Sequence, residues 1–173
     1  SEFVPREVIQ RRSDLRLHEV GGVLEARRLL EPRVAQLAAV HGSEADFEAM
    51  EQTIALQVKL AESAGSELIA HEDRFLGLDQ RFHLAIARAT GNSTIVGLMR
   101  TLLRRLDIAR DMAMHEPPTV EWSLDIHRQT VDSIRSGDMA RIEVVMDEHL
   151  AELERAWERD LDPARPVIRD LPD

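Results

Sequence analysis

The stretch LDQRFHLAIARATGN, residues 78–92, predicts the fold class of this chain of 173 residues. Its apolar side chains recur every three or four residues, which is the spacing of one face of an α-helix. Gly91 then ends that helix and Asn92 caps the next one, and we assign Asn92 no other role. The stretch therefore predicts two consecutive helices joined by a short turn.

The same pairing of a stop residue and a cap divides the rest of the chain. Gly42 precedes Ser43 and Gly137 precedes Asp138, a residue that we interpret only as a cap. No segment alternates apolar and polar residues in the manner of a strand. We therefore predict an all-α antiparallel bundle of about six helices, at about 19–41, 43–64, 66–90, 92–115, 119–136 and 138–159.

The ends of the chain differ from this periodic region. Residues 1–18 lack clear periodicity and predict a linker or a cloning remnant, residues 19–160 form the expected helical domain, and residues 161–173 form an irregular, proline-containing tail. Pro32 predicts a kink or a split in the first helix, near Leu30.

The composition excludes several classes of function. Hydrophobic residues make up 43% and charged residues 31%, a globular balance, and no apolar run is long enough for a membrane span. A net charge of -10 and 3% aromatic residues argue against direct contact with DNA or RNA. The absence of cysteine excludes disulfides and thiolate metal sites. A cytoplasmic location is the default expectation.

Polar residues interrupt the apolar faces of three predicted helices. Asp79 and His83 lie one turn apart beside one face, while His127 and His149 occupy inward positions on two others. A single inward histidine is more often a core residue bonded to a backbone carbonyl, and an Asp–His pair is usually a surface contact. Three inward histidines beside a carboxylate make one shared cation an equally good explanation.

The chemistry of these four groups limits which cation would fit. Three imidazole nitrogens and one carboxylate oxygen suit Zn, Ni, Fe or Mn rather than Ca or Mg. An octahedral ion would keep two positions for water or a bidentate small molecule, whereas tetrahedral zinc would keep none and be structural. We interpret the other histidines as solvated, namely His18, His41, His71 and His115.

Arg27 is a second polar residue on an apolar face, which we expect to comprise Val20, Val23, Leu30, Val34 and Leu37. One interpretation is an ion pair with Glu31, one turn later. The other is a guanidinium that faces the interior of the bundle and holds a carboxylate ligand. Three arginines of the fourth helix could serve the same end, Arg104, Arg105 and Arg110.

Four segments, in this order and at these distances, resemble a known family. They are EARRLLEPRVAQLAA (25–39), LDQRFHLAIARATGN (78–92), DIHRQTVDSIRSGD (125–138) and ARIEVVMDEHL (140–150). Together they resemble the ligand-binding domain of GntR-superfamily transcription regulators, in the branch named after the FadR C-terminal domain (FCD). The resemblance covers residues 19–155.

The resemblance implies a bundle with a central cavity, in which a divalent metal is held by Asp79, His83, His127 and His149. It also implies a small organic acid as effector, with Arg27 as a candidate contact, and a homodimer. DNA would be bound only by a separate N-terminal winged helix-turn-helix domain, which we expect this chain to lack.

The leading hypothesis is therefore an effector-sensing domain of a transcription regulator and not an enzyme. A mononuclear histidine/carboxylate metalloenzyme is the first alternative, although the sequence holds no H-E-x-x-H motif and no obvious general base. A helical domain with a purely structural metal, or with ordinary core histidines, is the other.

Overall fold

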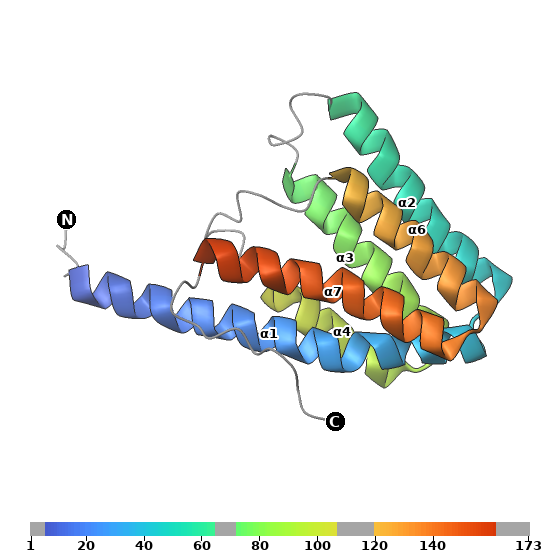
Figure 1. Cartoon of the computed structure of the whole chain (residues 1–173), viewed down its shortest axis with the longest axis horizontal. Coiled ribbons are helices and arrows are strands. Elements are labelled where there is room, and N and C mark those ends of the chain that lie inside the picture. The colour runs from blue at the N-terminus through green and yellow to red at the C-terminus, as the bar shows by residue number, and fades with distance from the viewer. Residues whose placement is uncertain (1–5, 65–71, 107–119, 162–173) are drawn as a thin grey trace.

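The computed structural model describes residues 6–64, 72–106 and 120–161 (Figure 1). These residues contain six helices and no strand, which confirms the predicted all-α class. The helices are α1 (Arg6–His41), α2 (Glu44–Ala64), α3 (Glu72–Ala89), α4 (Ser93–Arg105), α6 (Val120–Ser136) and α7 (Met139–Leu161).

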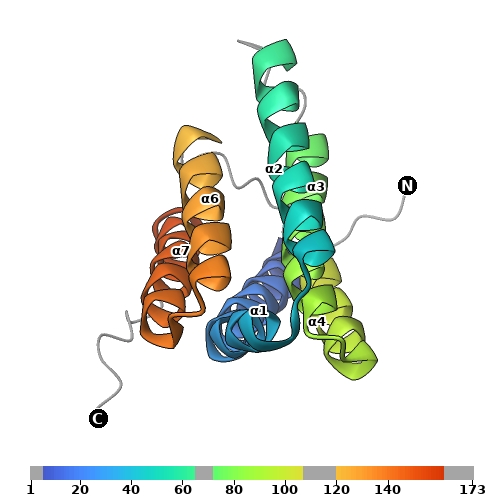
Figure 2. The same ribbon diagram turned by 90° about the vertical axis from the view of Figure 1, so that its right-hand side faces the viewer.

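The helices pack as two groups around α1. Figure 2 shows α6 and α7 on one side of α1, and α2, α3 and α4 on the other. α1 packs against α7, α3, α4 and α6, while α2 packs against both α3 and α6 and so joins the two groups. The centre of the bundle is therefore walled by α1, α2, α3, α6 and α7.

The core between these helices is apolar except at its centre. Phe82 of α3, Met50 of α2 and Met146 of α7 are fully buried, and α4 contributes Met99 and Leu103. Burial of apolar surface stabilises the fold by roughly 25 cal/mol for each Å² removed from water. Among the described helices, none is long and apolar enough to cross a membrane.

Two turns follow the pattern predicted from the sequence. Gly91 and Gly137 both have a φ of +68°, a backbone conformation that a side chain disfavours. The Asn92 side chain accepts hydrogen bonds from the backbone N–H groups of Thr94 and Ile95, and that of Asp138 accepts from those of Ala140 and Arg141. Both predicted caps are confirmed.

The course of α1 differs from the prediction at two points. The helix begins at Arg6 rather than near residue 19, and it continues through Pro32, so it is not split there; the alternative of a kink near Leu30 stays a prediction. Packing against α7 holds this region together, because the Arg28 side chain donates hydrogen bonds to Asp147 and Glu154 of α7. Those contacts oppose the loss of one backbone hydrogen bond at the proline.

The buried face of α1 also differs from the predicted one at its C-terminal end. Leu37 is 39% exposed, while Ala35 and Ala38 are fully buried, because the face that meets the core shifts around the helix. The expected helical residues 66–71 and 107–115 and the tail 162–173 lie outside the described residues. The assignment of residues 1–18 as a linker or cloning remnant stays a prediction.

Two glycine substitutions should change stability in opposite directions. Gly137→Ala should destabilise the protein by about 1 kcal/mol, because alanine disfavours a positive φ. Gly97→Ala, at an exposed position inside α4 where an added Cβ meets nothing within 4 Å, should stabilise it by up to about 1 kcal/mol. Urea unfolding followed by circular dichroism measures both; a shift of the same sign in the two variants would contradict this description.

Candidate metal centre

The four predicted ligand residues converge at the centre of the bundle. Asp79 and His83 come from α3, His127 from α6 and His149 from α7. One possible ligand atom from each lies within 4.8 Å of the corresponding atom of every other residue. The three histidines are at most 1% exposed, and the Asp79 side chain is 18% exposed. Helices that are distant in sequence therefore bring together one compact donor set that could hold a metal ion.

The Asp79 carboxylate lies between two of the imidazoles. Its Oδ1 is 3.1 Å from His127 Nε2, and its Oδ2 is 3.8 Å from His83 Nε2. The ring of His149 lies 5.0 Å from that of His83 and 4.9 Å from that of His127, between centroids. The four side chains therefore surround one small volume instead of forming separate pairs.

Several nitrogens in this cluster lack hydrogen-bond partners. Both ring nitrogens of His83, Nε2 of His127 and Nδ1 of His149 are buried, and none makes a well-aligned hydrogen bond within the described part of the chain. A buried polar atom without a partner costs free energy. A single cation could accept several of these lone pairs at once. The donor set thus fits a divalent transition metal.

Gln57 of α2 determines which nitrogen of His127 faces this volume. Its Oε1 is 3.0 Å from His127 Nδ1, and a carbonyl oxygen can only accept a hydrogen bond, so Nδ1 carries the proton. The lone pair of His127 then lies on Nε2, the atom directed at Asp79. Gln57 is fully buried, so this orientation is fixed within the core.

Glu31 of α1 lies beside Nδ1 of His83, as Gln57 lies beside Nδ1 of His127. Its Oε2 lies 2.6 Å from His83 Nδ1, although the ring is not aligned for a linear hydrogen bond. Its Oε1 pairs with Nε of Arg27, one turn earlier in α1. Arg27, Glu31 and His83 thus form a buried row that leads from α1 to the cluster. Carboxylates in this position orient histidine ligands in metal sites.

The two interpretations of Arg27 prove to be compatible. The residue forms the ion pair with Glu31, and at 1% exposure it is also inside the bundle. Its Nη2 is buried and has no hydrogen-bond partner among the described residues. Arg27 therefore keeps one buried donor free, although its Nε is occupied by Glu31.

The sequence did not identify Glu31 and Gln57 as residues of this site. Both follow the helical spacing of a buried face, since Val34 and Ala35 follow Glu31 by about one turn and Leu60 follows Gln57. That spacing could have placed both in the core. Their histidine partners could not have been found this way, because each contact joins different helices.

Burial and neighbouring charges set the protonation states in the cluster. Burial by itself would raise the pKa of Glu31 and of Asp79, but Arg27 and His83 lower the pKa of Glu31, and the adjacent His127 and His83 lower that of Asp79, far below ordinary values. Burial lowers the pKa of His149 well below its usual value and that of His127 to a smaller extent. At neutral pH the carboxylates are therefore charged, and these two histidines are neutral, as metal ligation requires.

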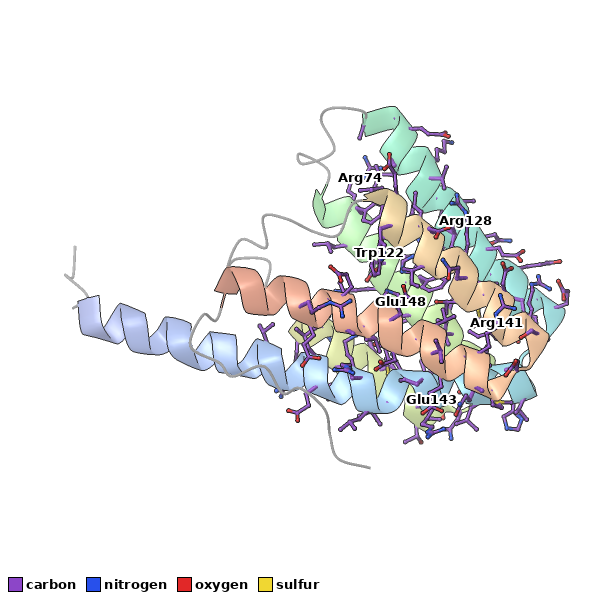
Figure 3. The ribbon with its side chains drawn as sticks, viewed as in Figure 1. Arg74, Trp122, Arg128, Arg141, Glu143 and Glu148 are labelled. Carbon is purple, nitrogen blue, oxygen red and sulfur yellow. The ribbon has the colours of Figure 1, made fainter. Side chains whose placement is uncertain are left out.

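Aromatic side chains pack against two of the imidazoles. The Phe82 ring stacks on His127, with centroids 4.1 Å apart. Trp122 lies in the first turn of α6 (Figure 3) and meets His149 edge-on, with ring centroids 6.1 Å apart. These contacts restrict the rotation of the imidazole rings, while charged residues such as Arg128 and Glu148 are exposed on the outer faces of α6 and α7.

The other residues considered from the sequence do not join the centre. Arg104, Arg105 and His41 are exposed, and the side chains of Arg110, His18, His71 and His115 lie outside the described residues. Two surface grooves are present, one between α2 and α6 and one between α1 and α7, and none of the four cluster residues lines either. The predicted central cavity stays a prediction.

Comparison with known families agrees with this architecture. The family model described as "FCD domain" matches residues 22–152, and the chain therefore belongs to the FCD domain family. It is accordingly the effector-binding type of domain that GntR-family transcription regulators carry.

Individual proteins support the same placement. The Uxu operon transcriptional regulator of Escherichia coli is 32% identical over 74% of this chain and 49% of its own length. The HTH-type transcriptional regulator LutR of Bacillus subtilis is 31% identical over 81% of this chain and 63% of its own. The chain thus spans about half to two thirds of these relatives. The structure of Streptococcus agalactiae GntR has the same fold, with a TM-score of 0.64 at 24% identity over 80% of this chain and 59% of that one.

Removing one partner of the buried Arg27–Glu31 pair should destabilise the fold strongly. Arg27→Met should lower the free energy of unfolding by about 3–5 kcal/mol, because it leaves the Glu31 carboxylate buried without its cation. The double variant Arg27→Met/Glu31→Gln should be more stable than Arg27→Met alone. Arg155→Met, which removes an exposed pair with Glu152, is the control and should change little. Urea unfolding tests all three; a double variant no more stable than Arg27→Met would argue against coupling between the two residues.

The metal-free protein should lose stability in two steps as the pH falls. The folded pKa values of His127 and His149 are lowered, so below about pH 6.5 the unfolded chain binds more protons than the folded one. The lowered pKa values of Asp79 and Glu31 should cause a second loss below about pH 4. Melting temperatures in chelator from pH 7.5 to 3.5 measure both steps, and the first should shrink in His149→Gln. Equal melting temperatures at pH 7.5 and 5.5 would contradict the first step.

Proposed function

We propose that this domain senses a small organic acid through a divalent metal held by Asp79, His83, His127 and His149. The observation that carries the proposal is the convergence of three buried imidazoles whose nitrogens lack well-aligned hydrogen bonds around one carboxylate. Zn, Ni, Fe and Mn all suit this donor set. The bound metal would supply Lewis acidity toward an anionic ligand, while the protein orients its own donors through Gln57 and Glu31.

Arg27 is the residue that we propose to contact the acid. Its buried Nη2 needs a hydrogen-bond acceptor, and a carboxylate oxygen is the acceptor that a guanidinium binds most strongly. Positive charge at Arg27 also acts on Asp79, His127 and His149, so the guanidinium lies near the ligand set. A carboxylate between Arg27 and the metal would satisfy both.

The acid would regulate DNA binding by a separate winged helix-turn-helix domain, in a homodimeric protein. Two-fold symmetric proteins match palindromic operators, which supports the dimer. α1 supports the coupling, because it carries Arg27 and Glu31 while its N-terminal turns project past the bundle (Figure 1). If α1 can adopt two orientations relative to the bundle, a ligand that binds more tightly to one of them would increase the fraction of molecules in that orientation.

The relatives favour a sensor over the metalloenzyme alternative, since both curated proteins are named as transcriptional regulators. The enzyme hypothesis would be revived by turnover of a bound acid in the metal-loaded protein.

Metal and acid binding can be measured together by calorimetry. Wild-type protein stripped with chelator should take up about one divalent ion per chain, and His127→Ala should bind it at least about tenfold more weakly, because a ligand is lost. His41→Ala removes an exposed histidine at the end of α1 and is the matched control, with unchanged affinity.

The same variants test the acid. Small hydroxy acids should bind the metal-loaded wild type and His41→Ala, and bind weakly or not at all to His127→Ala and to stripped wild type. Equal affinity for the acid in all four samples would show that the metal is not its site.

A further inference from the structure

The charged groups at the centre of the bundle form a small and countable set. Within the described residues, the buried charged side chains other than histidines are Arg27 and Glu31, and the half-buried Asp79 lies beside them. The arginines of α3, Arg74, Arg81 and Arg88, are exposed. The centre therefore contains one fixed cation and two fixed anions, and the histidines must be neutral to bind a metal.

A divalent metal would leave this centre with one uncompensated positive charge. The ion and Arg27 supply three positive charges, and Asp79 and Glu31 supply two negative ones. An unbalanced charge in a buried site is costly, because the surroundings solvate it poorly. One incoming negative charge removes the imbalance, whereas two would reverse its sign and none would leave it in place.

We propose that the effector is a monoanion, specifically a small monocarboxylic acid with a hydroxyl group next to the carboxylate. One carboxylate oxygen would accept from the free Nη2 of Arg27. The other carboxylate oxygen and the hydroxyl would fill the two positions that four protein ligands leave on an octahedral metal. The inference rests on the proposed function and restricts its ligand class by charge.

A second carboxylate on the ligand would have no favourable position in this site. The three histidines and Gln57 are at most 1% exposed, so the Asp79 side chain, at 18%, is the most exposed member of the set. A second carboxylate placed there would lie against an existing negative charge and would be repelled. A dianion is thus disfavoured both by the total charge and by its position.

Two matched pairs of ligands separate charge from size. Lactate and lactamide differ by one negative charge at nearly equal size, and so do malate and its monoamide, malamate. Calorimetry with the metal-loaded 173-residue chain at pH 7.5 should show lactate binding at least about tenfold more tightly than lactamide, which is about 1.4 kcal/mol. Malamate should likewise bind at least about tenfold more tightly than malate.

The preference for a monoanion can also be tested by changing the charge of the protein instead of that of the ligand. Glu31→Gln keeps the side-chain shape and raises the charge of the centre by one, so it should shift the preference from malamate toward malate. Glu143→Gln removes an exposed carboxylate of α7 and should leave the order unchanged. If Glu31→Gln does not fold, the four titrations of the wild type decide the question alone.

The outcomes distinguish this inference from the function on which it rests. Malate binding as tightly as malamate, or lactamide as tightly as lactate, would overturn the monoanion assignment while leaving an acid sensor intact. Retention of metal without binding of any of the four compounds would count against both. Failure to bind a metal would contradict the proposed function first.

Discussion

The constraint on which the rest of this structure depends is the burial of three imidazoles around one carboxylate. Histidine nitrogens can be hidden from water only if each finds a proton donor, an acceptor or a metal. Asp79 lies within 4 Å of Nε2 of His83 and of His127, but neither of these nitrogens makes a well-aligned hydrogen bond, nor does Nδ1 of His83 or of His149. An apolar core of this size could be built without any of these groups. We propose that their presence at its centre serves the binding of a metal and its ligand.

The surrounding helices are arranged to hold those rings in one orientation. α2 supplies Gln57, which fixes the tautomer of His127, and α1 supplies Glu31, which lies against His83. The centre therefore ties together α1, α2, α3, α6 and α7, and only α4 among the described helices contributes no side chain to it. These contacts join the two groups of helices. A change in the positions of the central side chains would therefore act on the helices on both sides of α1 (Figure 2). In the proposed sensor, the residues that tie these helices together would also be the ones that respond to the ligand.

Much of this was predictable from the sequence, and the part that was not has a definite physical cause. The apolar spacing and the stop-and-cap pairs at Gly91–Asn92 and Gly137–Asp138 predicted helices and turns, because they depend only on neighbours along the chain. The inward positions of His127 and His149 followed from the same spacing. The contacts of Gln57 and Glu31 with histidines did not, because they depend on how separate helices face one another. The continuity of α1 through Pro32 was missed for a similar reason, since Arg28 is held by residues of α7.

The position of Arg27 suggests why the site contains a buried ion pair at all. Without Glu31, a metal and a guanidinium close together would repel one another in a medium that screens charge poorly. With Glu31, the pair is neutral, so the arginine could remain beside a bound metal while one of its donors stays available. Glu31 thus contacts His83 and Arg27 at once, and Arg27 and Glu31 lie one turn apart in α1. In the proposed sensor, an acid that binds Arg27 would act on the same turn that orients a metal ligand. α1 is then the direct route from the effector to the N-terminal end of the domain, because it carries that turn and continues without a break to Arg6.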